Sequence, residues 1–215
     1  MFGVMCNTLD EPEKDVGFNI TAGGNYEFKL SDNWRLRNEA MIYNSKYSDK
    51  KYDDTYLYYV LGLKYVYEKG DVFFGPTVSR RYLGHKAYNY STGFMIETGY
   101  DITKQLNASL SLAYTPTYYD DYGDILDGDT KSARLRLFYA LDSSKYLIFR
   151  TGYEYEKTKD RTYTNGRINV ALGFGAELPY GFHVYAEPSV LFTNYKGERW
   201  TCLLYTSPSP RDRSV

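Results

Sequence analysis

Apolar and polar residues alternate with a period of two along most of the chain, and this pattern constrains the fold more than any other feature. In the segment LNASLSLAYT, Leu110 and Leu112 fall on one face, and Ser109 and Ser111 fall on the other. Successive side chains of a β-strand point to opposite sides, so the pattern predicts a strand with one apolar and one polar face. The same alternation recurs in 56–67, 132–141 and 167–177.

The polar faces of these segments carry charged residues in mid-strand. The predicted inward-facing set is Lys64, Glu97, Arg134, Arg136, Arg150, Glu154, Arg167 and Glu177. A packed core does not bury unpaired charges, whereas a wide, wet lumen accepts them. We therefore predict an all-β protein, an antiparallel up-and-down transmembrane β-barrel. The alternative is a soluble sandwich or lipocalin-like barrel with its apolar face inward, but the segments run roughly 12–16 residues, against about 5–6 for typical soluble strands.

The segments predict about ten strands of an incomplete barrel, with connections that alternate in length. They span 17–30, 34–47, 55–67, 71–82, 90–102, 106–119, 130–141, 146–157, 164–177 and 182–195. SDN, EKGD, TKQ, DSSK and LPYG are short connections, and YSDKKYDD, LGHKAYN, YDDYGDILDGDT and KTKDRTYTNG are longer and charged. Short periplasmic turns opposite longer extracellular loops are typical of outer-membrane barrels. Pro76, Pro116 and Pro188 interrupt strand segments and each predicts a bulge or a strand end.

The order of short and long connections predicts strands beyond both ends of the pattern. The connection at 31–33 is short, so the first segment runs toward the periplasm, and the last segment runs outward from the short turn at 178–181. Bacterial barrels are even-stranded, and both of their ends usually lie in the periplasm. We therefore expect at least one strand to be missing from each end, with 1–16 an irregular extracellular lead-in and 17–200 the barrel fragment.

Composition fits this fold and argues against several functions. The chain has 26 Tyr, 11 Phe and 2 Trp, which suit pleated surfaces and aromatic girdles. The formal net charge of −1 makes no case for nucleic acid, and no apolar run is long enough for a transmembrane helix. Two cysteines, one near each end, lack metal-ligand spacing. His85 and His183 fall at opposite ends of the predicted wall, so we expect no catalytic, cofactor or metal site and no enzyme.

Two groups of charged residues have alternative interpretations. The acidic loop 120–129 gathers Asp120, Asp121, Asp124, Asp127 and Asp129. These carboxylates could bind Ca²⁺, but the spacing is not that of an EF-hand, and a solvated external loop is the favoured interpretation. The inward charges either form cross-strand ion pairs that stabilise the wall, which is favoured, or make a polar surface that cargo or a plug domain contacts.

Three stretches resemble the C-terminal barrel of the surface lipoprotein assembly modifier family. They are YDDTYLYYVLGLKYVYEKGDVFFGPTVSRRYLGHKAYNYSTGF, ILDGDTKSARLRLFYAL and TYTNGRINVALGFGAELPYGFHVYAEPSV, and the resemblance covers 17–197. It implies a barrel of about fourteen strands, a periplasmic tetratricopeptide-repeat domain before it, and delivery of lipoproteins or related cargo across the Gram-negative outer membrane to the cell surface. Implied partners are outer-membrane lipid, that cargo and the repeat domain, which this chain lacks.

The stretch 201–215 departs from the strand pattern. One permitted back-translation of CLLYTSPSPRD resembles the transposon-end adapter of sequencing libraries, so we expect a non-native tail without packed structure.

Three functions follow from these observations. The first is the barrel of a secretion factor for surface lipoproteins, on the family resemblance. The second is a passive porin or generic outer-membrane barrel, on the pattern and the charged lumen. The third is a soluble ligand-binding barrel.

Overall fold

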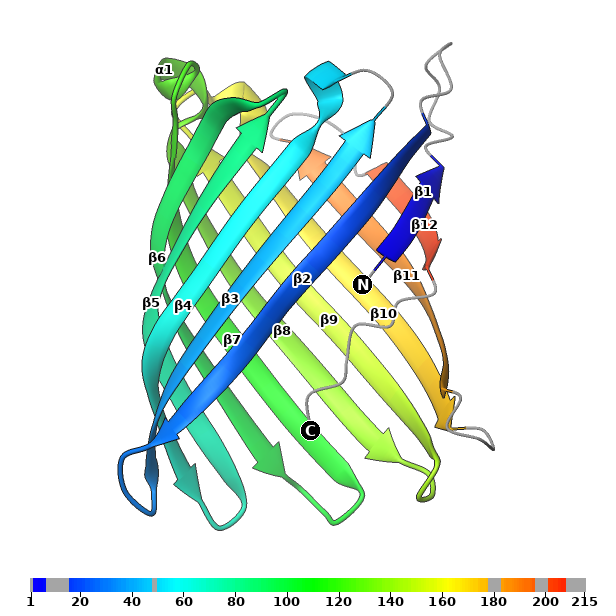
Figure 1. The fold of residues 1–215 in the computed structure, drawn as a ribbon. Coiled ribbons are helices and arrows are strands. Elements are labelled where there is room, and N and C mark those ends of the chain that lie inside the picture. The colour runs from blue at the N-terminus through cyan, green and yellow to red at the C-terminus, as the bar shows by residue number, and fades with distance from the viewer. Residues whose placement is uncertain (1, 7–15, 48–49, 178–182, 196–200, 208–215) are drawn as a thin grey trace.

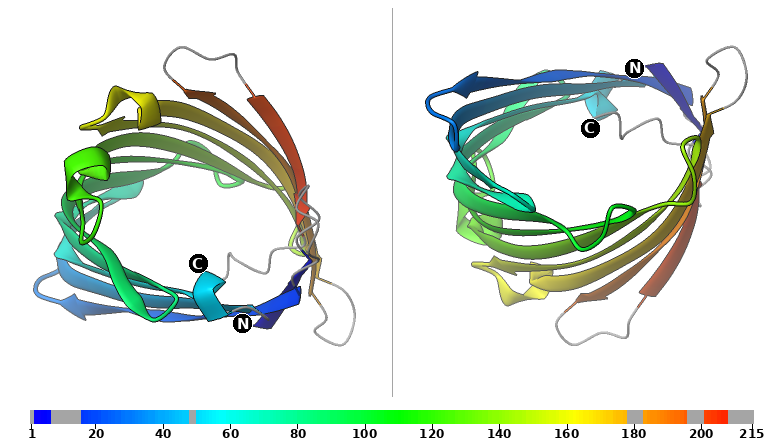
Figure 2. Two further views of the ribbon diagram at one scale, coloured as in Figure 1. Left: turned by 90° about the horizontal axis from the view of Figure 1, so that it is seen from above. Right: turned by 90° about the horizontal axis from the view of Figure 1, so that it is seen from below.

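A computed structural model describes residues 2–6, 16–47, 50–177, 183–195 and 201–207 of the chain (Figure 1). They form one twelve-stranded antiparallel sheet in which each strand pairs with its neighbours in chain order. Seen along its axis, the sheet curls into a wall around an interior (Figure 2). Among the described residues no ladder joins β1 to β12, so the wall is an open barrel. The predicted fold class is confirmed.

Ten long strands make up most of the wall, and two short strands flank them. The bounds are β1 (Phe2–Cys6), β2 (Val16–Lys29), β3 (Trp34–Tyr47), β4 (Asp54–Tyr67), β5 (Gly70–Leu83), β6 (Lys86–Asp101), β7 (Leu106–Tyr119), β8 (Gly128–Ala140), β9 (Lys145–Thr158), β10 (Asn165–Glu177), β11 (His183–Tyr195) and β12 (Thr201–Ser207). Strands β2 to β11 correspond to the ten predicted segments, and the largest difference in a boundary is the earlier start of β6 at Lys86. The period-two pattern therefore located every long strand.

The flanking strands correct two expectations about the ends of the pattern. Phe2–Cys6 forms β1 and pairs with β2, so the prediction of an irregular lead-in is wrong for these residues. Thr201–Ser207 forms β12 and pairs with β11, so the expectation of a tail without ordered structure is wrong for the backbone of this part. A strand edge offers unpaired N–H and C=O groups, and the Phe, Val, Tyr and Thr residues of these two segments favour strands, so pairing is the physical outcome. Residues 208–215 lie outside the described part, and the origin of the tail stays a prediction.

The two rims of the barrel differ as predicted, with one exception. Short turns close the lower rim in Figure 1, and the upper rim carries the short helices η1 (Lys50–Tyr52), α1 (Gly123–Leu126) and η2 (Arg161–Tyr163). The exception is LGHKAYN, predicted as a long loop, because only Gly84 and His85 separate β5 from β6. Both residues have positive φ, 53° and 67°, which the tightest hairpin turns require. The two strands therefore continue through the rest of the predicted loop.

The three prolines lie inside strands, so the prediction of a bulge or strand end at each is wrong. Pro76, Pro116 and Pro188 each fall at a gap in one ladder, for example between the pairs Val60↔Thr77 and Leu63↔Phe74 of β4 and β5. Proline has no N–H to donate, which explains the gap. On its other side each proline keeps a register partner, as in Pro76↔Phe94, and these second ladders carry the strand through the gap.

A close contact inside the wall joins β3, β4 and β5. Phe73 of β5 is fully buried, and a Cβ atom added to Gly62 of β4 would lie 2.8 Å from its ring atom Cε2. The guanidinium carbon of Arg37 on β3 lies 4.8 Å from the centroid of the same ring. Glycine at position 62 thus lets the phenyl ring lie against the wall beneath an arginine.

We expect Gly62→Ala to lower the free energy of unfolding by about 1–3 kcal/mol, because the new methyl group overpacks Phe73 and the β5 backbone. Denaturant unfolding in detergent micelles, followed by tryptophan fluorescence, measures this change. Gly24→Ala is the matched control, since a Cβ atom there meets nothing within 4 Å. Equal unfolding midpoints for the two variants would contradict the packing described here.

Candidate functional site

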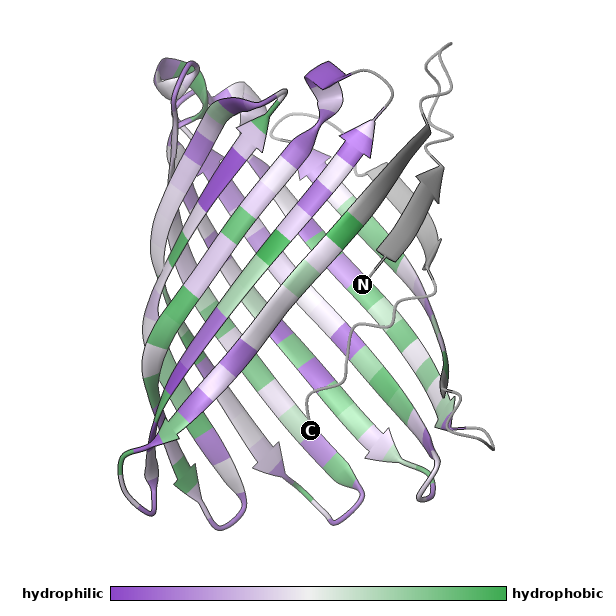
Figure 3. Ribbon diagram, viewed as in Figure 1, coloured by the Kyte–Doolittle hydropathy of each residue, from purple (hydrophilic) through white to green (hydrophobic). Residues whose placement is uncertain are grey.

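The two faces of the wall have opposite chemical character. Large apolar side chains on the outer face are exposed, including Leu110, Leu112, Leu172 and Phe174, and Leu172 exposes 55% of its surface. Figure 3 shows the alternation of hydrophilic and hydrophobic residues along the strands. Charged side chains lie on the inner face, and there they line the interior cavities. This is the arrangement of a barrel that contacts lipid outside and water inside.

The interior contains two cavities, of about 530 Å³ and about 840 Å³. They share one lining residue on each of the five consecutive strands β6 to β10, so they form one continuous polar space. The shared residues are Glu97, Ser111, Arg134, Glu154 and Arg167. We call this space the lumen, and we call its smaller cavity, which residues of β6 to β11 line, the lower cavity.

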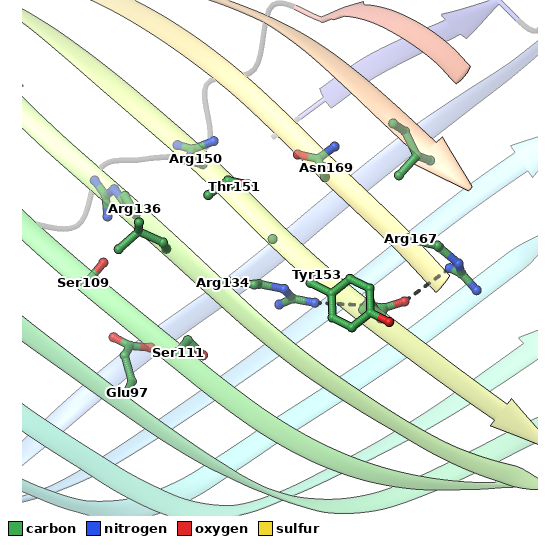
Figure 4. A pocket seen from close by; sticks show the side chains of 14 residues that line it. Glu97, Ser109, Ser111, Arg134, Arg136, Arg150, Thr151, Tyr153, Arg167 and Asn169 are labelled. Atoms are coloured by element: carbon green, nitrogen blue, oxygen red, sulfur yellow. Dashed lines mark ion pairs between the residues drawn. The ribbon is translucent and has the colours of Figure 1, made fainter. Parts of the chain in front are cut away.

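Glu154 of β9 links two arginines on the neighbouring strands in the lumen. Its Oε2 lies 3.5 Å from Nη2 of Arg134 on β8, and its Oε1 lies 3.3 Å from Nη1 of Arg167 on β10 (Figure 4). Arg167 also pairs with Glu156 through Nη2. The predicted cross-strand ion pairs are therefore present on this part of the wall, where each carboxylate stabilises cations that face it.

Arg150 reaches across a whole strand to its partner. Its Nη1 lies 2.7 Å from Oε2 of Glu187 on β11, although β10 runs between them. The β10 residue opposite Arg150 is Ala171, which is small and buried. The hydroxyl of Tyr185 donates a hydrogen bond of 2.6 Å to the same Glu187 oxygen. This carboxylate is thus held by one cation and one hydroxyl.

The opposite wall holds a second set of pairs. Lys64 of β4 lies 3.0 Å from Oε1 of Glu27 and 3.4 Å from Oδ2 of Asp71. Arg37 of β3 lies 2.8 Å from Oε2 of Glu39 and 3.5 Å from Oε1 of Glu97, which is three strands away on β6. Lysine and arginine charges on this wall therefore face carboxylates too.

The structure divides the predicted site residues into three groups. Six of them line the lower cavity, namely Glu97, Arg134, Arg136, Arg150, Glu154 and Arg167. Lys64 lies on another part of the wall. Glu177 is an exposed residue that ends β10, where its N–H donates to the carbonyl of Ser144, and it lines neither described cavity.

The sequence analysis missed several lumen charges that the same pattern would have revealed. They are Glu27, Arg35, Arg37, Glu39, Glu156 and Glu187. Arg35, Arg37 and Glu39 are spaced two apart in β3, and Glu156 continues the series of Arg150 and Glu154 in β9. Applying the period-two rule to these strands would have placed each of them on the inner face.

Two carboxylates of the acidic loop form local contacts with basic side chains. Asp120 pairs with Arg80 at 3.0 Å, and Asp127 lies 3.0 Å from Nζ of Lys159. The N–H of Tyr119 donates to Asp127 at 2.7 Å, and this bond lowers the pKa of the Asp127 carboxyl. In the described part of the chain no three His, Cys, Asp or Glu side chains are grouped to hold a metal ion.

The two histidines lie at opposite rims. His85 is in the upper-rim turn, with Nε2 3.3 Å from Oδ2 of Asp53, and His183 begins β11 at the lower rim. No helix within the described ranges has the length and apolar character needed to cross a membrane.

The comparisons with known proteins point to one family. The family model described as "Surface lipoprotein assembly modifier" matches residues 2–213. A protein of that name from Pasteurella multocida (strain Pm70) is 25% identical over 205 residues, which cover 86% of this chain and 39% of the relative. The chain thus spans about two fifths of that relative's length.

Similar solved structures are porins. The NanC porin aligns with a TM-score of 0.49 and 11% identity, over 83% of this chain and 80% of that chain. The KdgM porin, in complex with disordered oligogalacturonate, aligns with a TM-score of 0.40 and 14% identity, over 84% of this chain and 83% of that chain.

We expect Glu154→Gln to lower the free energy of unfolding by about 1–3 kcal/mol, because Arg134 and Arg167 both lose their charged partner. Glu154 is half-buried, so its ion pairs are only partly screened by water. Denaturant unfolding of the micelle-bound chain measures the change. Glu68→Gln in an exposed lower-rim turn is the control. A cost for Glu154→Gln no larger than that for the control would show that these pairs do not stabilise the wall.

A second pair of variants tests which face contacts lipid. Leu110→Arg on the outer face is expected to cost about 2–4 kcal/mol in a bilayer, whereas Ser111→Arg on the lumen face is tolerated. Folding yield and unfolding free energy in lipid vesicles measure both. If Ser111→Arg were the more damaging change, the assignment of the two faces would be reversed.

Proposed function

The chain belongs to the surface lipoprotein assembly modifier family, and on this premise we propose that it forms the outer-membrane barrel of a factor that helps deliver surface lipoproteins or related cargo across the bacterial outer membrane. The resemblance inferred from the three sequence stretches is thereby confirmed at the level of the family. The observation that carries the proposal is the match of the family model to residues 2–213, nearly the whole chain.

The geometry supports this proposal through its two faces. The exposed outer face of Leu, Phe and Tyr side chains suits contact with outer-membrane lipid of a Gram-negative cell. The lumen is polar, and most of its described charges have partners within the wall. Such a surface presents hydrogen-bonding groups to a passing polypeptide without a strong net field of one sign.

The proposed partners follow from the same premise. They are outer-membrane lipid at the outer face, a lipoprotein or secreted protein as cargo, and a periplasmic repeat domain outside this chain. We propose neither a cofactor nor an enzymatic step, because the candidate residues are charges in a wall and their geometry suits pairing and contact with cargo.

A passive porin is the second candidate function. The observation in its favour is the continuous polar lumen formed by the two cavities, which suits the diffusion of small solutes. The two candidate functions predict different effects of losing the gene. A delivery factor is needed for surface display of a lipoprotein, whereas a porin is needed for uptake of a solute.

The test compares Gram-negative cells with and without the complete gene that encodes this barrel. An epitope-tagged lipoprotein of the same organism is detected by antibody on intact cells, and its total amount is measured after lysis. We expect loss of the gene to reduce the exposed lipoprotein without changing its total amount. In the same cells, uptake of a small hydrophilic solute tests the porin function.

The two readouts separate the outcomes. Reduced surface display with unchanged solute uptake supports delivery. Unchanged display with slower uptake contradicts delivery and supports a porin. Unchanged display and unchanged uptake exclude both proposals for this barrel under the conditions tested.

A further inference from the structure

One row of inward-facing residues crosses the wall with two arginines side by side. The register places Ser109 of β7 opposite Arg136 of β8, Arg136 opposite Arg150 of β9, and Arg150 opposite Ala171 of β10. Directly opposed residues in an antiparallel ladder have Cα atoms about 4.5–5.5 Å apart. Both arginines line the lower cavity, and Figure 4 shows Arg136 beside Ser109 with Arg150 on the neighbouring strand.

This arrangement is unfavourable for the wall alone. Like charges placed directly opposite each other destabilise a sheet. Arg150 is paired with Glu187, but Arg136 has neither an ion pair nor a side-chain hydrogen bond within the described ranges. The Nε atom of Arg136 is buried and without an acceptor. A guanidinium that is partly removed from water with an unmet donor costs free energy.

The inner-face charges of β8 to β11 that lie in or beside the lower cavity are also unequal in number. Apart from Glu177 at the lower rim, four arginines (Arg134, Arg136, Arg150 and Arg167) lie among three glutamates (Glu154, Glu156 and Glu187), so arginines outnumber carboxylates by one on this part of the inner face. Glu97 also lines the lower cavity, but it pairs with Arg37 of the opposite wall. Among the described residues, Arg136 is therefore the one of these four arginines that forms no direct ion pair.

We propose that Arg136 and Arg150 form a binding site for a carboxylate group that enters the lumen. The planar guanidinium fork donates two parallel hydrogen bonds to a carboxylate, here from the Nη groups of Arg136, since its Nε is buried. One carboxylate would give Arg136 the direct ion pair that it lacks within the described wall. The hydroxyl of Ser109, directly opposite Arg136, is a further donor to the same group.

The space around the two arginines suits an entering ligand. The next inward positions on β7, β9 and β10 are occupied by Ser111, Gly152 and Asn169, which are small or polar. The lower cavity has a volume of about 530 Å³, which admits a side chain or a small organic anion. The inference concerns the lumen wall itself and does not depend on what cargo the barrel delivers.

The test uses the full chain in non-ionic detergent micelles and observes the Nε–H resonance of Arg136 by NMR. The resonance is assigned by its absence in Arg136→Gln. Three probes are titrated: acetate, the blocked tripeptide Gly-Glu-Gly, and the blocked tripeptide Gly-Gln-Gly as the uncharged control. We expect the resonance to move in a saturable way with acetate and Gly-Glu-Gly, and to be unaffected by Gly-Gln-Gly.

The variants are compared by ligand-observed NMR. Arg136→Gln is expected to weaken binding of both carboxylate probes by about tenfold or more, because it removes a charge-assisted bidentate contact. Arg136→Lys keeps the charge but loses the planar fork, so it should weaken binding by a smaller factor. Arg80→Gln, which removes an upper-rim arginine paired with Asp120 outside the cavity, is the matched control and should bind like the unchanged chain.

Stability separates a binding role from a structural one. If Arg136 serves the ligand, Arg136→Gln should unfold at the same or higher denaturant concentration, because the opposition to Arg150 is relieved. A lower unfolding midpoint for Arg136→Gln together with unchanged probe binding would overturn the proposal. Absence of saturable binding of both carboxylate probes to the unchanged chain would also overturn it.

The two carboxylate probes distinguish the source of the group. Tighter binding of Gly-Glu-Gly than of acetate points to an acidic side chain of a polypeptide, and equal binding points to a free small carboxylate. Either result supports the site, and the Gly-Gln-Gly control shows whether the carboxylate itself is recognised.

Discussion

Backbone hydrogen bonding is the constraint on which the rest of this structure depends. A strand that crosses lipid must satisfy its N–H and C=O groups through neighbouring strands, because the bilayer core offers no water. The ladders from β2 to β11 do this over 13 to 16 residues per strand. Once the backbone is fixed in this way, side chains must alternate between lipid and lumen. The inner-face position of the charges that line the lumen follows from that alternation.

The inner face shows how small residues and ion pairs depend on each other. Arg150 can reach Glu187 on β11 because Ala171 leaves space on the strand between them. Arg37 reaches Glu97 over β4 and β5, where Gly62 lies opposite Arg37 and Phe73 lies against the wall. A larger side chain at either small position would block the arginine as well as overpack the wall. The glycine, the aromatic ring and the charge thus act as one packed unit.

Most of the fold was predictable from the sequence, and the features that were not have physical reasons. The period-two pattern located β2 to β11 and placed Arg134, Glu154 and Arg167 together, because alternation is a local property. The partner of Arg150 was not predictable, since pairing across β10 depends on register and on the size of Ala171. The tight turn at Gly84 and His85 was not predicted, because the mostly polar residues 86–89 that follow it resemble a loop but form the start of β6. The strands continue through their prolines because each proline is still paired with the neighbouring strand on its other side. The sequence of one strand does not show which of its two neighbours pairs at a given residue.

The charges of the lumen can be sorted by what they contribute to the wall. Glu154 lowers the electrostatic energy of two arginines, so its presence is explained by stability alone. A carboxylate or a neutral residue opposite Arg150 would make the sheet more stable. The residue at that position, Arg136, is instead another arginine. A sequence that obeys the cross-strand charge rule at neighbouring positions and breaks it at one position does so at a measurable cost. On the inner face of β8 and β9, Glu154 therefore stabilises the fold, whereas Arg136 opposite Arg150 destabilises it.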